Sequence, residues 1–83
     1  MTGKSRIKRK VVKEQLTAIL KKINKNYANL SFKKNLQYQN IDSIDYLNFI
    51  LKVQSKLKIN LNNKELNKIK TLNNLITLIS KKL

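Results

Sequence analysis

The spacing of apolar residues is the feature that most constrains the fold of this 83-residue chain. Apolar side chains recur every three or four positions over residues 10–27, 43–57 and 72–79, which is the pattern of helices with one buried face. The sequence has no Pro and a single Gly, so nothing breaks a helix inside these segments. We therefore predict an all-α fold: one domain over residues 1–83, built as a small bundle of three main helices plus one short helix.

Capping signals mark where three of these helices begin. Asp42 is a favourable N-cap, and Asp45 follows at the spacing of a capping box, with Asp in place of the usual Glu. Asn62 and Glu65 repeat this pattern and predict a short helix directly after them. Thr71 is placed to cap the last helix. The sequence thus predicts sharp starts for the last three helices.

The segments outside these helices differ in character. Residues 1–9 are basic, and we expect them to form a flexible N-terminal segment ahead of the first helix. Residues 28–42 show no sustained period, and a loop this long in so small a domain is uncommon and often functional. We expect Phe32, Leu36 and Tyr38 to anchor this loop on the core, with a short helical turn within it.

The composition excludes several kinds of chemistry. The chain has no Cys and no His, so it has no thiol nucleophile, no imidazole base and neither of these common metal ligands. We therefore expect a protein that is not an enzyme and has no metal site of its own. No apolar run approaches the roughly 18 residues of a membrane span, and the N-terminus lacks the apolar segment of a secretion signal. These absences predict a cytoplasmic protein, which we expect to be monomeric.

The charge is the most unusual bulk property. The chain carries 19 Lys+Arg against 4 Asp+Glu, a formal charge of +15, which indicates nucleic acid, an anionic membrane or an acidic protein as partner. An excess of Lys, Asn and Ile is also typical of compositional bias. One alternative function is therefore a small basic helical protein that binds nucleic acid or associates with the ribosome. Such a protein commonly uses Arg and aromatic residues on its basic face, whereas 2 of the 19 basic residues are Arg and the aromatic residues mostly fall on apolar faces.

Half of the chain's acids lie around one serine, in the stretch Asp42-Ser43-Ile44-Asp45. A nucleophilic serine needs a base within hydrogen-bond reach, and the two carboxylates belong more naturally to the helix cap, so we expect no catalysis by Ser43. The residue types alone slightly favour the interpretation that Ser43 is an ordinary first residue of a helix, a position where serine is common.

This stretch and its surroundings resemble the acyl carrier proteins. In that family, the serine of an Asp-Ser-Leu-Asp-type motif carries 4′-phosphopantetheine, and this chain has Ile44 in place of the Leu. The similarity covers roughly residues 10–80 and includes the order of the helices and the long loop. Further positions that match the family pattern are Ser31, Phe32, Leu36, Leu47, Ile50, Leu51, Leu57, Leu61, Glu65 and Ile69 to Leu72.

The resemblance implies a carrier that holds acyl intermediates as thioesters on a 4′-phosphopantetheine arm, in fatty acid or specialised lipid biosynthesis. The arm is taken from coenzyme A by a phosphopantetheinyl transferase and is attached covalently to Ser43, and Asp42 helps to hold the metal ion of that transferase. Acyl-loading and acyl-processing enzymes are the further partners. The residues expected to contact partners are Ile44, Asp45, Leu47, Asn48, Lys52 and Lys56. The residues expected to line an acyl cavity are Leu47, Leu51, Leu57, Leu61, Ile69 and Ile76.

The chain departs from the family in its charge. Members of the family are strongly acidic, and their partners recognise carboxylates along the second helix with Lys and Arg. The positions where acids are usual hold Asn48, Gln54, Ser55 and Lys56. Lys52 adds further positive charge to the same helix. The resemblance therefore implies the attachment serine more firmly than it implies the usual partners, and it leaves polyketide and peptide cargoes open.

Overall fold

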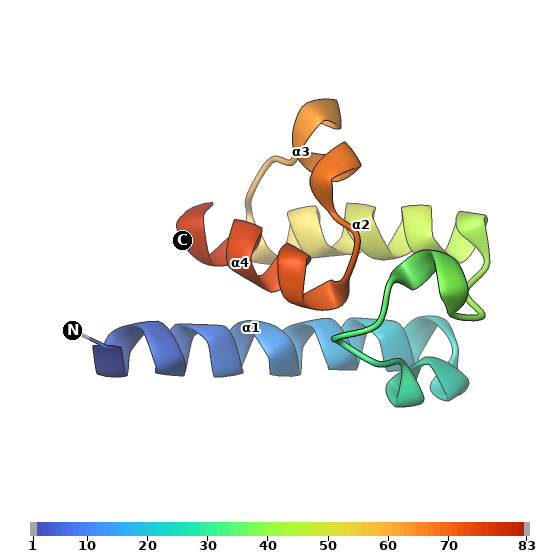
Figure 1. The fold of residues 1–83 in the computed structure, drawn as a ribbon, viewed down its shortest axis with the longest axis horizontal. Coiled ribbons are helices and arrows are strands. Elements are labelled where there is room, and N and C mark those ends of the chain that lie inside the picture. The colour runs from blue at the N-terminus through green and yellow to red at the C-terminus, as the bar shows by residue number, and fades with distance from the viewer. Residues whose placement is uncertain (1, 83) are drawn as a thin grey trace.

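The chain folds as an all-helical bundle (Figure 1). The computed structural model describes residues 2 to 82 and contains no strand within them. Three main helices, α1 (Thr2–Ile23), α2 (Ser43–Leu57) and α4 (Leu72–Lys82), form the bundle, and the short helix α3 (Asn63–Lys68) connects α2 to α4. α1 packs against both α2 and α4, which run in the opposite direction to it (Figure 1). The predicted fold class is confirmed.

The core lies where the apolar faces of the three main helices meet. Phe49 has the largest of the fully buried side chains, and burying a side chain of this kind contributes about 1.5–3 kcal/mol. The other fully buried residues are Val12, Leu16, Leu20, Val53, Leu72, Leu75 and Ile79. Isolated helices as short as α2, with 15 residues, and α4, with 11, are marginal in water. The shared burial against α1 is therefore what holds them in place. No helix within residues 2–82 is long and apolar enough to cross a membrane.

The start of α1 differs from the prediction. The helix begins at Thr2 rather than near Lys10, so the expected boundary after residue 9 is wrong, and Met1 lies outside the described residues. Apolar periodicity cannot find this start, because Ile7 is the one large apolar residue ahead of Lys10 in the helix. The flexibility of this segment stays a prediction.

The end of α1 also differs from the prediction. The helix stops at Ile23, and a 3-10 helix, η1 (Lys25–Asn29), follows it. Asn24 causes this change, because its side-chain oxygen accepts a hydrogen bond from the backbone N–H of Asn26 at 3.0 Å and caps η1. Tyr27 therefore belongs to η1 rather than to α1, and it is buried.

The long loop before α2 is anchored on the bundle by two of its three predicted anchors. The loop contains the expected short turn, a 3-10 helix η2 (Leu36–Tyr38). Leu36 is buried, and its backbone N–H donates to the carbonyl of Lys70 at 2.8 Å. Phe32 is half-buried against the core. Tyr38 is 83% exposed, so its prediction as an anchor is wrong: η2 turns this ring outward when it turns Leu36 inward.

A glutamine side chain makes the loop compact. The Oε1 atom of Gln39 accepts a hydrogen bond from the Ser31 N–H at 2.7 Å. Its Nε2 atom donates to the carbonyls of Ser31 and Lys34 at 2.9 and 3.1 Å. One side chain thus closes the loop from residue 31 to residue 39 and fixes the direction in which the chain reaches α2.

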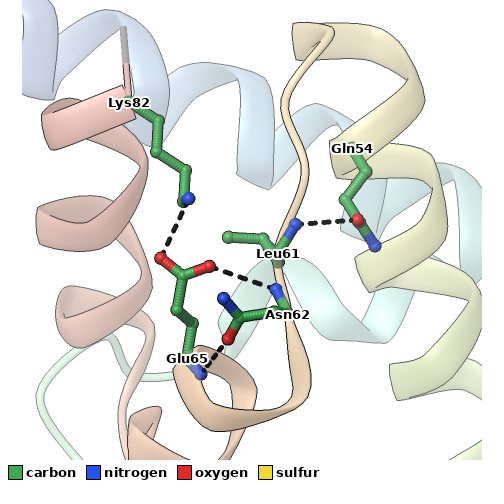
Figure 2. A network of polar contacts seen from close by, with 5 residues as sticks. All are labelled: Gln54, Leu61, Asn62, Glu65 and Lys82. Atoms are coloured by element: carbon green, nitrogen blue, oxygen red, sulfur yellow. Dashed lines mark hydrogen bonds and ion pairs between the residues drawn. The ribbon is translucent and has the colours of Figure 1, made fainter.

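A polar network holds the connection from α2 to α3 (Figure 2). Gln54 Oε1 accepts from the Leu61 N–H at 3.0 Å. Asn62 and Glu65 form the predicted capping box: Asn62 Oδ1 accepts from the Glu65 N–H at 2.8 Å, and Glu65 Oε1 accepts from the Asn62 N–H at 3.1 Å. Glu65 also pairs with Lys82 of α4 at 2.9 Å. The Lys82 ammonium, with the Asn62 N–H, lowers the pKa of Glu65.

The predicted cap of α4 is confirmed as well. Thr71 Oγ1 accepts a hydrogen bond from the Asn74 N–H at 3.0 Å. Asn74 Oδ1 accepts in return from the N–H groups of Thr71 and Lys70, at 3.1 and 3.0 Å. The start of α4 is therefore closed by local contacts, with Asn in the place where Glu is usual.

Candidate functional site

Ser43 is the first residue of α2 and lies exposed at that end of the bundle. Its hydroxyl makes no hydrogen bond to any other described residue. A serine often caps a helix from the position before the first helical residue, but here Asp42 occupies that position. The Ser43 hydroxyl is therefore accessible from solvent and free of a structural role.

Asp42 caps α2 as the sequence predicted. Its backbone is extended, and its Oδ1 accepts a hydrogen bond from the Ile44 N–H at 2.8 Å. The Asp42 carbonyl accepts from the Tyr46 N–H at 2.8 Å. The first of these bonds satisfies one of the four N–H groups that a helix start leaves open. The second is the first backbone bond of the helix itself, and together they set Ser43 at the first helical position.

Asp45 does not complete the capping box directly, and this part of the prediction is wrong. The hydroxyl of Tyr27 stands between the two acids: it donates to Asp45 Oδ2 at 2.6 Å and accepts from the Asp42 N–H at 3.3 Å. The Asp side chain is one methylene shorter than the Glu that usually returns to the cap, and the phenol oxygen fills the gap. We call these contacts the Tyr27 link.

The Tyr27 link ties α2 to η1. The hydrogen bond to the Asp45 carboxylate holds the phenol in its protonated form and raises the pKa of Tyr27, while the contact with the Asp42 backbone acts in the opposite direction. The ring itself is buried, 7% exposed. Sequence reasoning assigned Tyr27 to the apolar face alone. The available signal was its hydroxyl, because a buried Tyr usually finds a hydrogen-bond partner for it.

A cleft opens beside Ser43, between the start of α2, the long loop and α3. Its volume is about 340 Å³. Ser43 lies on its lining, and the apolar part of that lining comes from Leu36, Ile41, Tyr46, Leu66 and Ile69. Tyr46 is half-buried, and burial raises its pKa. The rest of the lining is polar and consists of Asn35, Gln37, Gln39, Ser43 and Lys70. The cleft therefore offers an apolar chain fixed at Ser43 a wall that is apolar along only part of its length.

The structure places the six residues that are predicted to line an acyl cavity in three different surroundings. Only Ile69 lines the cleft beside Ser43. Leu47 and Leu51 lie on the outer face of α2 and are 58% and 54% exposed. The other three pack in or against the core: Leu57, Leu61 and Ile76. The apolar arc of α2 is wider than its contact with the bundle, and periodicity alone does not show which edge of such an arc stays outside.

The outer face of α2 is apolar next to Ser43 and basic farther along. The apolar stripe consists of Ile44, Leu47 and Leu51. The exposed polar and basic positions beside it are Asn48, Ser55, Lys52 and Lys56. Five of the six predicted contact residues thus lie exposed on one helix. Asp45, the sixth, is half-buried and bonded to Tyr27.

The carboxylates near Ser43 can supply part of a metal site. Among residues 2–82, no group of three or more His, Cys, Asp or Glu side chains is placed to hold a metal ion. Asp42 is exposed and uses Oδ1 in the cap, which leaves Oδ2 without a hydrogen bond to any described residue. Asp42 can therefore add one oxygen ligand to a metal ion that another protein brings.

Comparison with known proteins adds no relative to this description. No family model, no curated protein and no solved structure matches the chain. Any function must accordingly be inferred from the exposed Ser43, its capping acids and the cleft beside them.

Proposed function

We propose that this protein is an acyl carrier protein whose Ser43 accepts 4′-phosphopantetheine from coenzyme A. The observation that supports this most directly is the exposed Ser43 hydroxyl, which has no hydrogen bond to a described residue, at the N-terminus of a helix capped by Asp42. The arm attached there holds acyl intermediates as thioesters. Acyl-loading and acyl-processing enzymes of fatty acid or specialised lipid biosynthesis are the partners of such a carrier.

The attachment is a phosphoryl transfer to Ser43. The Ser43 Oγ–P bond forms, the P–O bond to the nucleotide part of coenzyme A breaks, and the hydroxyl proton passes to a base of the transferase. The base comes from the transferase because the chain has no His and the nearby Asp45 is bonded to Tyr27. The resulting phosphodiester lies at the start of α2, where the N–H groups and the helix dipole stabilise negative charge.

Two features of the chain suit this reaction. Asp42 caps the helix that begins at Ser43, and its second carboxylate oxygen makes no hydrogen bond to a described residue, so it can bind the metal ion of the transferase. The cleft of about 340 Å³ begins at Ser43 and is lined by apolar side chains such as Leu36 and Leu66. Each methylene that an acyl chain buries there contributes about 0.8 kcal/mol, so the cleft can shelter part of an apolar cargo.

The alternative, a nucleic-acid-binding protein, gains little support from the surface. Proteins that bind single strands stack bases on exposed aromatic rings. Of the chain's five aromatic residues, Tyr38 is the one that is exposed. Phe32 is half-buried with the Lys13 ammonium 5.1 Å from its ring centre, and Phe49 is fully buried. The carrier proposal accounts for the site at Ser43, which a nucleic-acid-binding role leaves unexplained.

Intact-mass measurement tests the proposal. The chain is incubated with coenzyme A, Mg²⁺ and a broad-specificity phosphopantetheinyl transferase. We expect one phosphopantetheine on the wild type, none on Ser43→Ala, and one on Ser55→Ala, the matched control because Ser55 is an exposed serine on the same helix. Labelling of Ser43→Ala, or no labelling of the wild type by any transferase tried, would overturn it.

A further inference from the structure

Three lysines gather around a second cleft, at the far end of α2 from Ser43. The cleft has a volume of about 270 Å³ and lies between α1 and α2. Lys22 comes from α1, and Lys52 and Lys56 come from α2. Ile19, which is buried, forms its apolar floor, and Ser55 completes the lining. We call this the lysine cleft.

The lysine cleft has no counter-charge within the chain. The chain has four acids. Asp42 lies about 15–21 Å along the axis of α2 from Lys52 and Lys56, and Asp45 lies about 10–16 Å from them. Asp45 is also bonded to the Tyr27 hydroxyl. Glu65 is paired with Lys82, and this is the one ion pair among the side chains that the structure describes, those of residues 9–82. Glu14 lies beside other lysines, on a different face of α1. The three ammonium groups are therefore close together, exposed and without an acidic partner.

The lysine cleft is continuous with the apolar stripe of α2. At 100° per residue, Leu47, Leu51 and Ile44 occupy adjacent directions around the helix axis, followed by Ser55 and Asn48, and then by the two lysines. The stripe is 54–67% exposed. One face of the molecule thus has an apolar part that begins beside Ser43 and a basic part that ends at α1.

We propose that this face binds the acidic surface of a partner protein. The partner has apolar side chains that cover the stripe and Asp or Glu side chains that enter the lysine cleft, because a cluster of unpaired ammonium groups favours negative charge and disfavours a basic surface. Because such a partner acts on the arm at Ser43, the inference rests on the proposed function. The resemblance to the acyl carrier proteins alone predicts a partner with a basic surface, whereas the lysine cleft favours a partner with an acidic one.

An NMR titration of the full, unmodified chain tests this face. The probe is a synthetic helical peptide with Leu at positions i, i+3 and i+7 and Glu along one flank, and the control peptide has Lys in place of each Glu. We expect the Glu peptide to shift the amide signals of the stripe and of Lys52 and Lys56, and to bind about tenfold more tightly than the Lys peptide at low salt. Equal binding of the two peptides, or shifts confined to other helices, would overturn the proposal.

Charge reversal locates the binding site. The triple variant Lys22→Glu, Lys52→Glu, Lys56→Glu should lose at least about tenfold in affinity for the Glu peptide. The matched control variant carries Lys10→Glu, Lys21→Glu and Lys25→Glu, which replace three exposed lysines outside the lysine cleft. This variant changes the net charge equally, and its affinity for the Glu peptide should fall by less than about threefold, because long-range electrostatic effects are screened. Circular dichroism checks that both variants are helical. Equal losses in the two variants would contradict a specific lysine cleft.

Two further measurements separate this inference from other outcomes. The first is the same titration with anionic lipid vesicles and with an RNA duplex. If either one shifts the same amide signals at a lower concentration than the Glu peptide does, the partner is a membrane or a nucleic acid rather than a protein, and the proposal is overturned. Transfer of phosphopantetheine to Ser43 reports on the proposed function alone. If the chain is labelled but binds both peptides equally, the proposed function stands and the proposed docking face is wrong. If the chain binds the Glu peptide but is never labelled, the docking face stands and the proposed function is wrong.

Discussion

The starts of α2 and α3 use the same residue spacing in two different ways. At α3, Asn62 and Glu65 bond each other's backbone directly, at 2.8 and 3.1 Å. At α2, Asp42 caps the helix, but Asp45 reaches the cap only through the hydroxyl of Tyr27. The first box is complete within four residues of sequence. The second depends on a residue 15 positions before the cap.

This difference separates a structural cap from one that is coupled to the site. The α3 box forms wherever those four residues become helical, because its contacts are local. The bond from the Ile44 N–H to Asp42 at the start of α2 is local too, but the Tyr27 link closes only when η1 has packed against the start of α2. The two starts can therefore be broken independently, and only one of them should affect the attachment of the prosthetic group.

The largest effect is expected from breaking the Tyr27 link. Tyr27→Phe keeps the buried ring and removes the hydroxyl, which leaves the Asp42 N–H and the half-buried Asp45 carboxylate without their partner. Since hydrogen bonds to charged groups are among the stronger ones, we expect Tm to fall by roughly 10 °C. Thermal unfolding followed by circular dichroism measures this shift.

Tyr46→Phe is the matched control for that variant. Tyr46 is half-buried, and its hydroxyl bonds to no other described residue, so its loss should change Tm by less than about 3 °C. If both variants melt alike, the Tyr27 link does not hold the start of α2.

The next effect concerns Asp42, where capping and metal binding can be separated. Asn caps a helix about as well as Asp, so Asp42→Asn should keep Tm within about 2 °C of the wild type. Removal of the charged oxygen should slow the transfer of phosphopantetheine to Ser43 by about tenfold, the lower end of the effect of losing an auxiliary metal contact. The labelling rate is measured by intact mass over time. An unchanged rate would show that Asp42 serves the cap alone.

A smaller effect is expected at the start of α3. Asn62→Ala removes the side chain that caps this helix, which costs about 1 kcal/mol and should lower Tm by about 4–8 °C. The labelling rate of Ser43 should stay the same, because the α3 box makes no contact with the Tyr27 link. Asn62→Asp keeps an N-cap acceptor and is the control. A labelling defect in Asn62→Ala at a temperature where it is folded would contradict the independence of the two starts.

The smallest effects are expected in the pH dependence of stability. The start of α3 should lose stability at low pH, and the start of α2 should lose it at high pH. The pKa of Glu65 is lowered by Lys82 and Asn62, so its contribution is present above about pH 4.5, its ordinary pKa, and is lost as the pH falls through the folded value. The pKa of Tyr27 is raised by Asp45, so its contribution is present below about pH 10 and is lost as the pH rises through the folded value.

Denaturant unfolding at a series of pH values measures how the free energy of unfolding falls at low pH, the acid limb, and at high pH, the alkaline limb. Glu65→Gln should flatten the acid limb relative to the wild type and leave the alkaline limb unchanged, and Tyr27→Phe should do the reverse. An alkaline limb that is the same in Tyr27→Phe and wild type would mean that Asp45 does not hold this phenol in its protonated form.

The sequence predicts those parts of the fold that are decided by neighbouring residues. The starts of α2, α3 and α4 follow from Asp42, Asn62 and Thr71, because an N-cap acts on N–H groups two or three residues away. The start of α1 was missed because the residues after Thr2 carry little apolar signal. Its end was missed because the apolar pattern continues over residues 10–27 as if they formed one helix, whereas Asn24 caps a separate 3-10 helix.

The candidate site is predictable only in part. The position of Ser43 at the start of a helix follows from its neighbours, but the Tyr27 link joins residues 18 positions apart. The cleft beside Ser43 brings together Leu36 and Leu66 from segments that share no pattern. The burial of α2 also depends on where α1 and α4 pack. The sequence alone therefore left Leu47 predicted both as a partner contact and as a cavity residue, and its side chain is exposed.

Tandem mass spectrometry of the chain coexpressed with a phosphopantetheinyl transferase tests most directly whether Ser43 is the attachment point. The chain has five serines, and the other four are Ser5, Ser31, Ser55 and Ser80. We predict that the phosphopantetheine mass is found on the fragment that contains Ser43, and that the other serines are unmodified. The group found on another serine, or none at all on a folded chain with an active transferase, would contradict the assignment of this protein as a carrier that uses Ser43.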